Sequence, residues 1–300
     1  MKRVPRTTTT NAPSRAAATN AVLHVLGARG TGDAGIASDA VLAWCDNGSG
    51  RPSVAIDERR IVRFVRTQRS ALLRQLRHRD VRRRHLTIWA LGVARDTRSA
   101  EQVIAAHDRH ANWFTHDYVF AAARRFGAKG VAAFERIATT TRGRSRDLAI
   151  ACLGTSRSGL TAITSLRRIV RRLGCSSAVL NSIYNLHDPR GIGLVLPPLT
   201  SDDPLVHDAV HALLGCLEAA KRSSQVRHRR RATAALHALF TSPEMLESPG
   251  DPWTSTFAFA LEALQRLDPT GAARLQKELG RRRLPPDRRE TLAELRAAAR

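Results

Sequence analysis

A short helix–turn–helix segment recurs along this chain of 300 residues and restricts the folds open to it. In its clearest copy, residues 178–199, apolar residues fall on one side of two helical segments: Val179, Leu180, Ile183 and Leu186 before the turn, and Ile192, Val195, Leu196 and Leu199 after it. Asp188 can cap the second helix and Pro189 suits its first position, whereas Pro197-Pro198 must shorten or kink it. Two short antiparallel helices cannot bury both faces alone, so we expect stacked neighbours.

Turns of this kind return along the chain with a regular period. Four glycines each precede an apolar residue that opens a second helix, at Gly130, Gly159, Gly191 and Gly271. The first three are about 30 residues apart, and the last interval equals two periods plus roughly 20 inserted residues. The insertion matches a basic, Pro-containing stretch at 221–252. Paired helices with this period predict an all-α fold, an α-solenoid of about six stacked antiparallel helix pairs.

A second recurring pattern ends the first helix of a pair. It reads Ala90-Leu91-Gly92, Cys152-Leu153-Gly154 and Leu213-Leu214-Gly215, with Asp96, Asp188 and Asp268 in the turns that follow first helices. Together these residues resemble HEAT repeats, in particular the short HEAT-like repeats of the phycobilin-lyase type, over roughly residues 80–282. The resemblance implies an armadillo-like helical fold in which the second helix of each pair lines the concave surface. It says little about function, because such repeats serve as scaffolds, nucleic-acid binders and a few enzymes.

The pattern predicts three regions. Residues 1–20 are rich in Thr, Arg, Ala and Asn, and Gly27 to Gly35 is glycine-rich, so residues 1–56 are expected to be a flexible basic N-terminal region. Sustained helical periodicity over 57–283 predicts the HEAT-like array. Residues 284–300 follow Pro285-Pro286 and are expected to form a C-terminal capping helix, with Asp287 in a capping-box-like start.

The charge balance favours a polyanionic partner. The chain has 49 Lys and Arg against 26 Asp and Glu, a formal net charge of +23, and all but four of the basic residues are arginine. Such a charge attracts nucleic acid, acidic proteins or anionic surfaces, although arginine excess also accompanies GC-rich genomes. No apolar run reaches the ~20 residues that span a bilayer, and the four cysteines form no close pair, so the expected location is the cytoplasm.

Arginine clusters are the candidate binding residues. On the predicted helix 159–173, Arg167, Arg168, Arg171 and Arg172 share one side. Two more clusters lie near helix starts, at Arg82, Arg83 and Arg84, and at Arg227, Arg229, Arg230 and Arg231. Cations there oppose the helix dipole, and a bound phosphate would relieve that repulsion. The alternative is a solvated basic face with no ligand.

Patterns for catalysis or metal binding are weaker. His-Asp dipeptides at 107–108, 116–117, 187–188 and 207–208 lack the further ligands of a metal site, and Asp188 is better explained as a cap. Trp113 with Asp117 resembles the aromatic and acidic pairs of HEAT-like DNA glycosylases, but ordinary core aromatic residues explain the pattern as well. We therefore expect no cofactor, metal or catalytic residue.

These observations lead to one functional hypothesis and two alternatives. The hypothesis is a non-enzymatic HEAT-like scaffold that binds a polyanion, nucleic acid in the first place, through its Arg-rich helix faces. The first alternative is a protein–protein interaction module for an acidic partner protein. The remote alternative is a HEAT-like DNA glycosylase. The sequence identifies neither the partner nor the oligomeric state.

Overall fold

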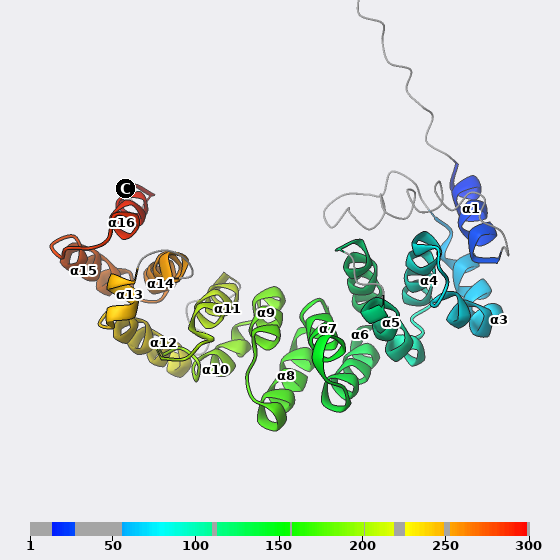
Figure 1. Cartoon of the computed structure of the whole chain (residues 1–300), viewed down its shortest axis with the longest axis horizontal. Coiled ribbons are helices and arrows are strands. Elements are labelled where there is room, and N and C mark those ends of the chain that lie inside the picture. Colours follow the sequence, from blue (N-terminus) through cyan, green and yellow to red (C-terminus); the bar gives the residue numbers. More distant parts are fainter. Residues whose placement is uncertain are drawn as a thin grey trace, which may run out of the picture. The chain divides into compact units, whose positions relative to one another are not determined.

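Every regular element that the computed structural model describes is a helix (Figure 1). The described residues are 14–27, 56–109, 113–156, 158–200, 202–218, 226–248 and 253–298, and they contain no strand. The all-α prediction is therefore confirmed over these ranges.

The chain divides into two compact units, residues 1–126 and 127–300. The division falls inside one long helix, α6 (Trp113–Thr140), whose helical backbone is interrupted at Gly127. Gly127 has a φ of 62° and a ψ of −152°, a conformation that only glycine adopts without a steric penalty. A glycine at this position therefore explains why the helix breaks there.

The N-terminal unit is built around two helices that pack against each other, α3 and α4. The helices of this unit that precede α6 are α1 (Arg15–Gly27), α3 (Glu58–Gln75), α4 (Val81–Val93), the short 3-10 turn η1 (Thr97–Ser99) and α5 (Ala100–Arg109). Asp57 begins α3, where its side chain accepts hydrogen bonds from the N–H groups of Arg59 and Arg60. Asp80 caps α4 in the same manner through the N–H of Arg82.

Helix α1 differs from the sequence expectation. Residues 15–27 fall inside the region 1–56 that was predicted to be flexible, yet they form a helix that packs on α3 and α4. Val22 and Val25 are completely buried, and the hydroxyl of Thr19 accepts a hydrogen bond of 2.9 Å from the N–H of Asp57. Burial of these few apolar residues against distant helices orders the segment. Residues 1–13 and 28–55 lie outside the described residues.

The C-terminal unit consists of two layers of helices. After the end of α6 its helices are α7 (Gly143–Gly154), α8 (Gly159–Leu173), α9 (Ser177–Leu186), η2 (Pro189–Gly191), α10 (Ile192–Val195), α11 (Val206–Glu218), α12 (Val226–Leu239), α13 (Pro243–Glu247), α14 (Trp253–Leu267), α15 (Pro269–Leu279) and α16 (Pro286–Ala298). In one layer α7, α9, α11, α14 and α16 pack successively. In the other, α8 packs on α7 and α9, α10 on α11, and α12 and α15 on α14.

The two layers place the Arg-bearing helix differently from the HEAT-like expectation. Within this unit, Figure 1 shows α9, α11 and α14 on the inner side of the curve and α8, α10 and α12 on the outer side. The resemblance implied that α8, as a second helix, would line the concave surface. Instead α8 lies on the outer side of this unit.

Glycines of the recurring Leu-Gly pattern mark points where two helices approach closely. A Cβ atom added to each would lie within 3 Å of neighbouring backbone: Gly92 at 2.6 Å from Cα of Ala122, Gly154 at 2.7 Å from Cα of Ser182, and Gly215 at 2.6 Å from the carbonyl oxygen of Tyr184. Real Cβ atoms do not approach so closely. The pattern that suggested repeats therefore has a direct packing cause.

The turn aspartates mostly cap helices, as predicted. Asp188 accepts a hydrogen bond from the N–H of Arg190, and Asp268 accepts one from the N–H of Gly271. Asp96 makes no such cap and instead pairs with Arg69 at 2.7 Å. Helix α10 is only four residues long and ends before Pro197, which confirms that the prolines shorten it.

Helix α16 is attached by a completely buried arginine. The guanidinium of Arg288 donates to the carbonyl oxygens of Met245 (3.0 Å) and Ser248 (2.6 Å) and to the hydroxyl of Thr254 (2.6 Å). It also lies over the ring of Phe257, 5.5 Å from the centroid. Asp287, expected to cap the helix, lies within it and accepts a hydrogen bond from Thr254 on α14.

Candidate functional site

The α8 strip, defined as Arg167, Arg168, Arg171 and Arg172, is the best-formed of the predicted arginine clusters. All four side chains are exposed, whereas Ile163, Leu166 and Ile169 bury the opposite side of the helix. This division gives the sequence its strongly amphipathic character and fixes which side of α8 faces solvent. The structure therefore places the four predicted residues together on one accessible surface.

One carboxylate lies beside the α8 strip. Arg168 pairs with Glu135 of α6 at 3.0 Å, and the hydroxyl of Ser165 donates to the same carboxylate at 2.6 Å. Within the described part of the chain, Arg167, Arg171 and Arg172 have no ion-pair partner. Leu160, which is 59% exposed, lies near the start of the same helix. The strip therefore presents three uncompensated guanidinium groups and one that is paired.

The cluster at the start of α4 is less accessible than the sequence indicated. Arg82 is exposed, but Arg83 and Arg84 are only 2% and 5% exposed. Arg84 donates to the carbonyl oxygens of His78 (2.6 Å) and Arg79 (2.9 Å), and burial lowers its pKa. These contacts fix the entry into α4, so only Arg82 remains available to a ligand in solution.

The cluster at the start of α12 is separated from the α8 strip by η2, which packs on α8, and by α10, which packs on η2 and α12. Arg230 and Arg231 are exposed, and Arg229 donates to the carbonyl oxygen of Arg266 at the end of α14. The side chain of Arg227 lies outside the described side chains. The two clusters of this unit therefore lie on different helices, with η2 and α10 between them.

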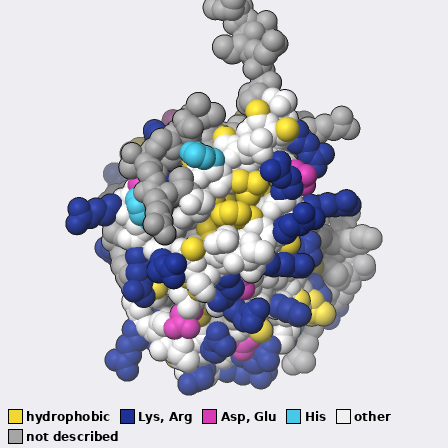
Figure 2. Space-filling view, turned by 90° about the vertical axis from the view of Figure 1, so that its right-hand side faces the viewer, with side chains coloured by type: hydrophobic (Ala, Val, Ile, Leu, Met, Phe, Trp, Pro, Cys, Tyr) yellow, Lys and Arg dark blue, Asp and Glu magenta, His cyan; other side chains and the backbone are white. Residues whose placement is uncertain are grey.

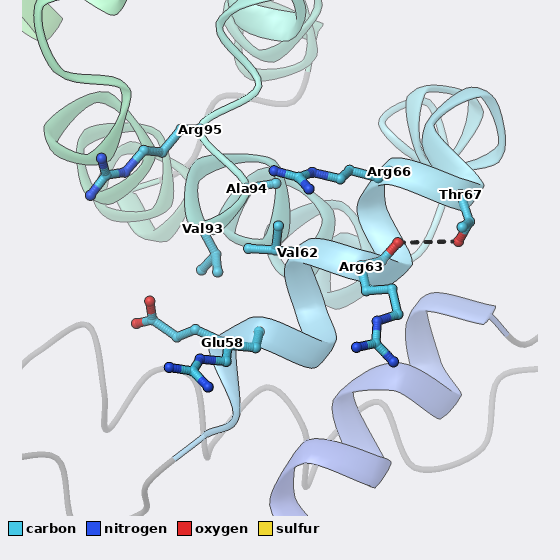
Figure 3. A pocket seen from close by; sticks show the side chains of 9 residues that line it. Glu58, Val62, Arg63, Arg66, Thr67, Val93, Ala94 and Arg95 are labelled. Carbon is cyan, nitrogen blue, oxygen red and sulfur yellow. Dashed lines mark hydrogen bonds between the residues drawn. The ribbon is translucent and has the colours of Figure 1, made fainter.

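A further basic site, which the sequence analysis did not select, lies between α3 and the end of α4 (Figure 3). This α3–α4 cavity has a volume of about 710 Å³ and is lined by Glu58, Arg59, Val62, Arg63, Arg66, Thr67, Val93, Ala94 and Arg95. Figure 3 shows Val62 and Val93 between Glu58 on one side and Arg66 and Arg95 on the other. A signal was present in the sequence, since Arg59, Arg63 and Arg66 recur at helical spacing.

Charges around the α3–α4 cavity are predominantly positive. Glu58 is paired with Arg125 at 3.0 Å, so its charge is compensated. Among the described residues, none of the four lining arginines has an ion-pair partner. Figure 2 views the side of the molecule on which α3 lies and shows hydrophobic side chains exposed between Lys and Arg side chains. By its lining residues, the cavity combines an apolar floor of Val62, Val93 and Ala94 with a cationic rim of four arginines.

Arg95 reaches the rim through an unusual backbone conformation. Its φ is 53°, in the left-handed region, where helices commonly end on glycine. The N–H of Arg95 donates to the carbonyl oxygen of Gly92, and the N–H of Asp96 donates to the carbonyl oxygen of Leu91. These two hydrogen bonds are the pattern of a Schellman motif. An arginine here costs about 1 kcal/mol relative to glycine. The chain tolerates this strain at a position that projects into the cavity rim.

The histidines of the His-Asp dipeptides have other contacts in the described part of the chain. No group of three or more potential metal ligands occurs among the described residues. His187 instead pairs with Glu218 at 2.7 Å, His207 bonds the hydroxyl of Thr256 at 2.8 Å, and His107 stacks on His116. The side chain of Trp113, needed for the glycosylase alternative, lies outside the described side chains.

Three of the four cysteines lie among the described residues, and all three are free thiols. Cys152 and Cys216 are fully buried, and burial raises the pKa of both thiols well above the ordinary value. Each packs as a small apolar residue, as the sequence predicted. Cys175 is half-buried and its pKa is also raised by burial, so it stays protonated near neutral pH.

Comparison with known proteins gives no relative: no protein-family model, curated protein or solved structure matches this chain. Among the described helices, none is both long enough and apolar enough to cross a membrane. The assignment of function consequently rests on the two arginine surfaces, the α8 strip and the α3–α4 cavity.

Proposed function

We propose that this protein is a non-enzymatic HEAT-like scaffold, an α-solenoid of stacked helix pairs, that binds nucleic acid through the α8 strip. The observation that carries the proposal is the exposure of four arginines on one face of α8, three of which lack a carboxylate partner among the described residues. A strip of this kind fits the phosphate backbone, because one guanidinium group can donate two hydrogen bonds to the oxygens of one phosphate.

Spacing along the helix supports a phosphate track. Arg167 and Arg171 are one helical turn apart, as are Arg168 and Arg172, which gives two rows with a rise of about 6 Å each. Duplex DNA carries one phosphate charge per ~1.7 Å of its axis. Because this spacing is shorter than the rise of a row, a phosphate group is available to the arginines of each row. Contacts of this kind position a nucleic acid without reading its bases.

The experiment replaces all four arginines of the α8 strip by glutamine and measures binding to duplex DNA at several salt concentrations. Glutamine is a good helix former, so the fold should persist. The slope of log K against log salt should shrink by about 3, because each lost phosphate contact removes roughly 0.9 and Arg168 is already engaged by Glu135. The affinity should fall alike for unrelated sequences.

A matched control neutralises Arg274, Arg281, Arg282 and Arg283. All four are exposed, and Arg282 forms an ion pair with Glu278. The control set therefore has the same number of charges as the α8 strip and the same number of arginines in ion pairs. We expect this variant to change the slope by less than about 1. Equal losses from both sets would indicate diffuse charge attraction, and an unchanged slope in the first set would exclude α8 from the binding surface.

A further inference from the structure

The α3–α4 cavity differs from the α8 strip because its arginines surround apolar side chains. Val93 is buried and Val62 half-buried, and together with Ala94 they form a floor within a cavity of about 710 Å³. Cavities of 300–1,000 Å³ with an apolar lining and a few polar groups typically bind ligands or anchor side chains. This volume is sufficient for one or two large side chains of a partner.

The rim supplies positive charge from two directions. Arg59, Arg63 and Arg66 lie at i, i+4 and i+7 and therefore project from one side of α3, and Arg95 approaches from the end of α4. Arg69, the next arginine on α3, does not line the cavity and is held by Asp96. The four rim arginines thus remain available to carboxylates that a ligand brings.

From this combination we propose that the α3–α4 cavity binds an acidic peptide segment of a partner protein, with one aliphatic side chain on the Val62–Val93 floor and carboxylates on the arginine rim. Leucine flanked by glutamate or aspartate satisfies both parts of the cavity. Burial of such a side chain favours the complex, and the charge pairs add specificity. The interaction is independent of the α8 strip.

Nucleic acid fits this cavity less well than a peptide does. Single strands are held by stacking of bases on aromatic rings, and no aromatic side chain belongs to the described lining. Duplex backbone needs only surface cations, so it would leave the valine floor without a partner. An aliphatic anchor with acidic neighbours uses every chemical feature that the cavity offers.

The test uses a fluorescent synthetic peptide of glutamate and aspartate with one central leucine, together with its leucine-to-alanine version. Binding to the full chain is measured by fluorescence anisotropy for wild type and for Arg63→Gln/Arg66→Gln. We expect the double variant to bind the leucine peptide about tenfold more weakly. The alanine peptide should also bind wild type about tenfold more weakly than the leucine peptide, because it lacks the isobutyl side chain that packs on Val62 and Val93.

Two controls separate a site from general charge. Arg60→Gln/Arg74→Gln removes two exposed arginines of the same helix that do not line the cavity, and it should change affinity less than about twofold. Val62→Ser should abolish the difference in affinity between the leucine and alanine peptides. The substitution in the protein and the one in the peptide remove the same apolar contact, so their effects should not add. The fourfold α8 variant should bind the peptide like wild type, whether or not α8 binds DNA.

Several outcomes would overturn the proposal. These are equal losses from the two arginine pairs, no preference for leucine over alanine, or no detectable binding at millimolar peptide. Displacement of the peptide by duplex DNA, with DNA affinity reduced by the Arg63→Gln/Arg66→Gln variant, would assign the cavity to a nucleic-acid surface instead.

Discussion

At the scale of single residues, the Leu-Gly glycines show how one missing side chain sets the distance between helices. A Cβ atom at Gly154 would meet the Cα of Ser182 at 2.7 Å, so α7 and α9 could not keep their present separation. Replacement of Gly154 by alanine should therefore destabilise the protein by about 1–3 kcal/mol, because packed helices must move apart. The measurement is the denaturant midpoint followed by circular dichroism.

Gly27 provides the matched comparison for that prediction. It also ends a helix, but an added Cβ would meet only the ring of Phe64, at an ordinary 3.6 Å. Alanine loses less backbone entropy than glycine when the chain folds, so Gly27→Ala should leave the stability of the protein unchanged or raise it slightly. Similar midpoints for the two variants would show that close approach is not what selects glycine at position 154.

At the scale of elements, α16 depends on the single buried side chain of Arg288. Replacement by methionine keeps much of the volume but removes the hydrogen bonds to the carbonyl oxygens of Met245 and Ser248. Because buried carbonyl groups are left without donors, we expect a loss of about 2–4 kcal/mol in the stability of this end of the unit. Hydrogen exchange should show faster opening of α16.

The neighbouring residue gives the control for Arg288. Arg289 is exposed on the same helix, and Arg289→Met should change stability by less than about 0.5 kcal/mol. Comparable exchange rates in the two variants would mean that α16 is held by its apolar contacts, such as buried Leu292, and not by the guanidinium of Arg288.

The same two arginines show where prediction of elements from sequence reaches its limit. Helical periodicity predicted the observed limits of α8, Gly159 and Leu173. This was possible because the spacing of apolar residues within the helix itself determines which face is buried. Helical spacing places Arg288 on the same side of α16 as buried Leu292, but the carbonyl groups that allow an arginine to be buried there lie about 40 residues away in the sequence. Helix α1 was missed for a related reason: Thr19 meets its partner, Asp57, only in the folded chain.

The candidate site was predictable only in part. The α8 strip lies on one helix, so its spacing alone brought Arg167 and Arg171 together. The α3–α4 cavity needs Val62 and Val93 side by side, and that contact depends on how two helices pack. Burial of Arg84 likewise follows from backbone carbonyls at the helix entry, which the sequence pattern does not reveal.

At the scale of the whole molecule, the HEAT-like proposal makes a prediction about size in solution. A compact protein of 300 residues has a radius of gyration of about 19 Å, whereas stacked helix pairs that contact only their neighbours produce an elongated particle. We expect small-angle scattering to give a radius of gyration well above that value. A result near 19 Å would contradict the solenoid arrangement while leaving the all-helical fold unaffected.

The glycine contacts also bear on how such a chain can change during evolution. Every single-base change that alters a glycine codon to another amino acid introduces a larger side chain. At positions 92, 154 and 215 any such side chain would collide with neighbouring helix backbone. Surface arginines and loop residues can drift without that restriction. Packing therefore restricts substitution at these three glycines more than it restricts substitution on the exposed face of a helix.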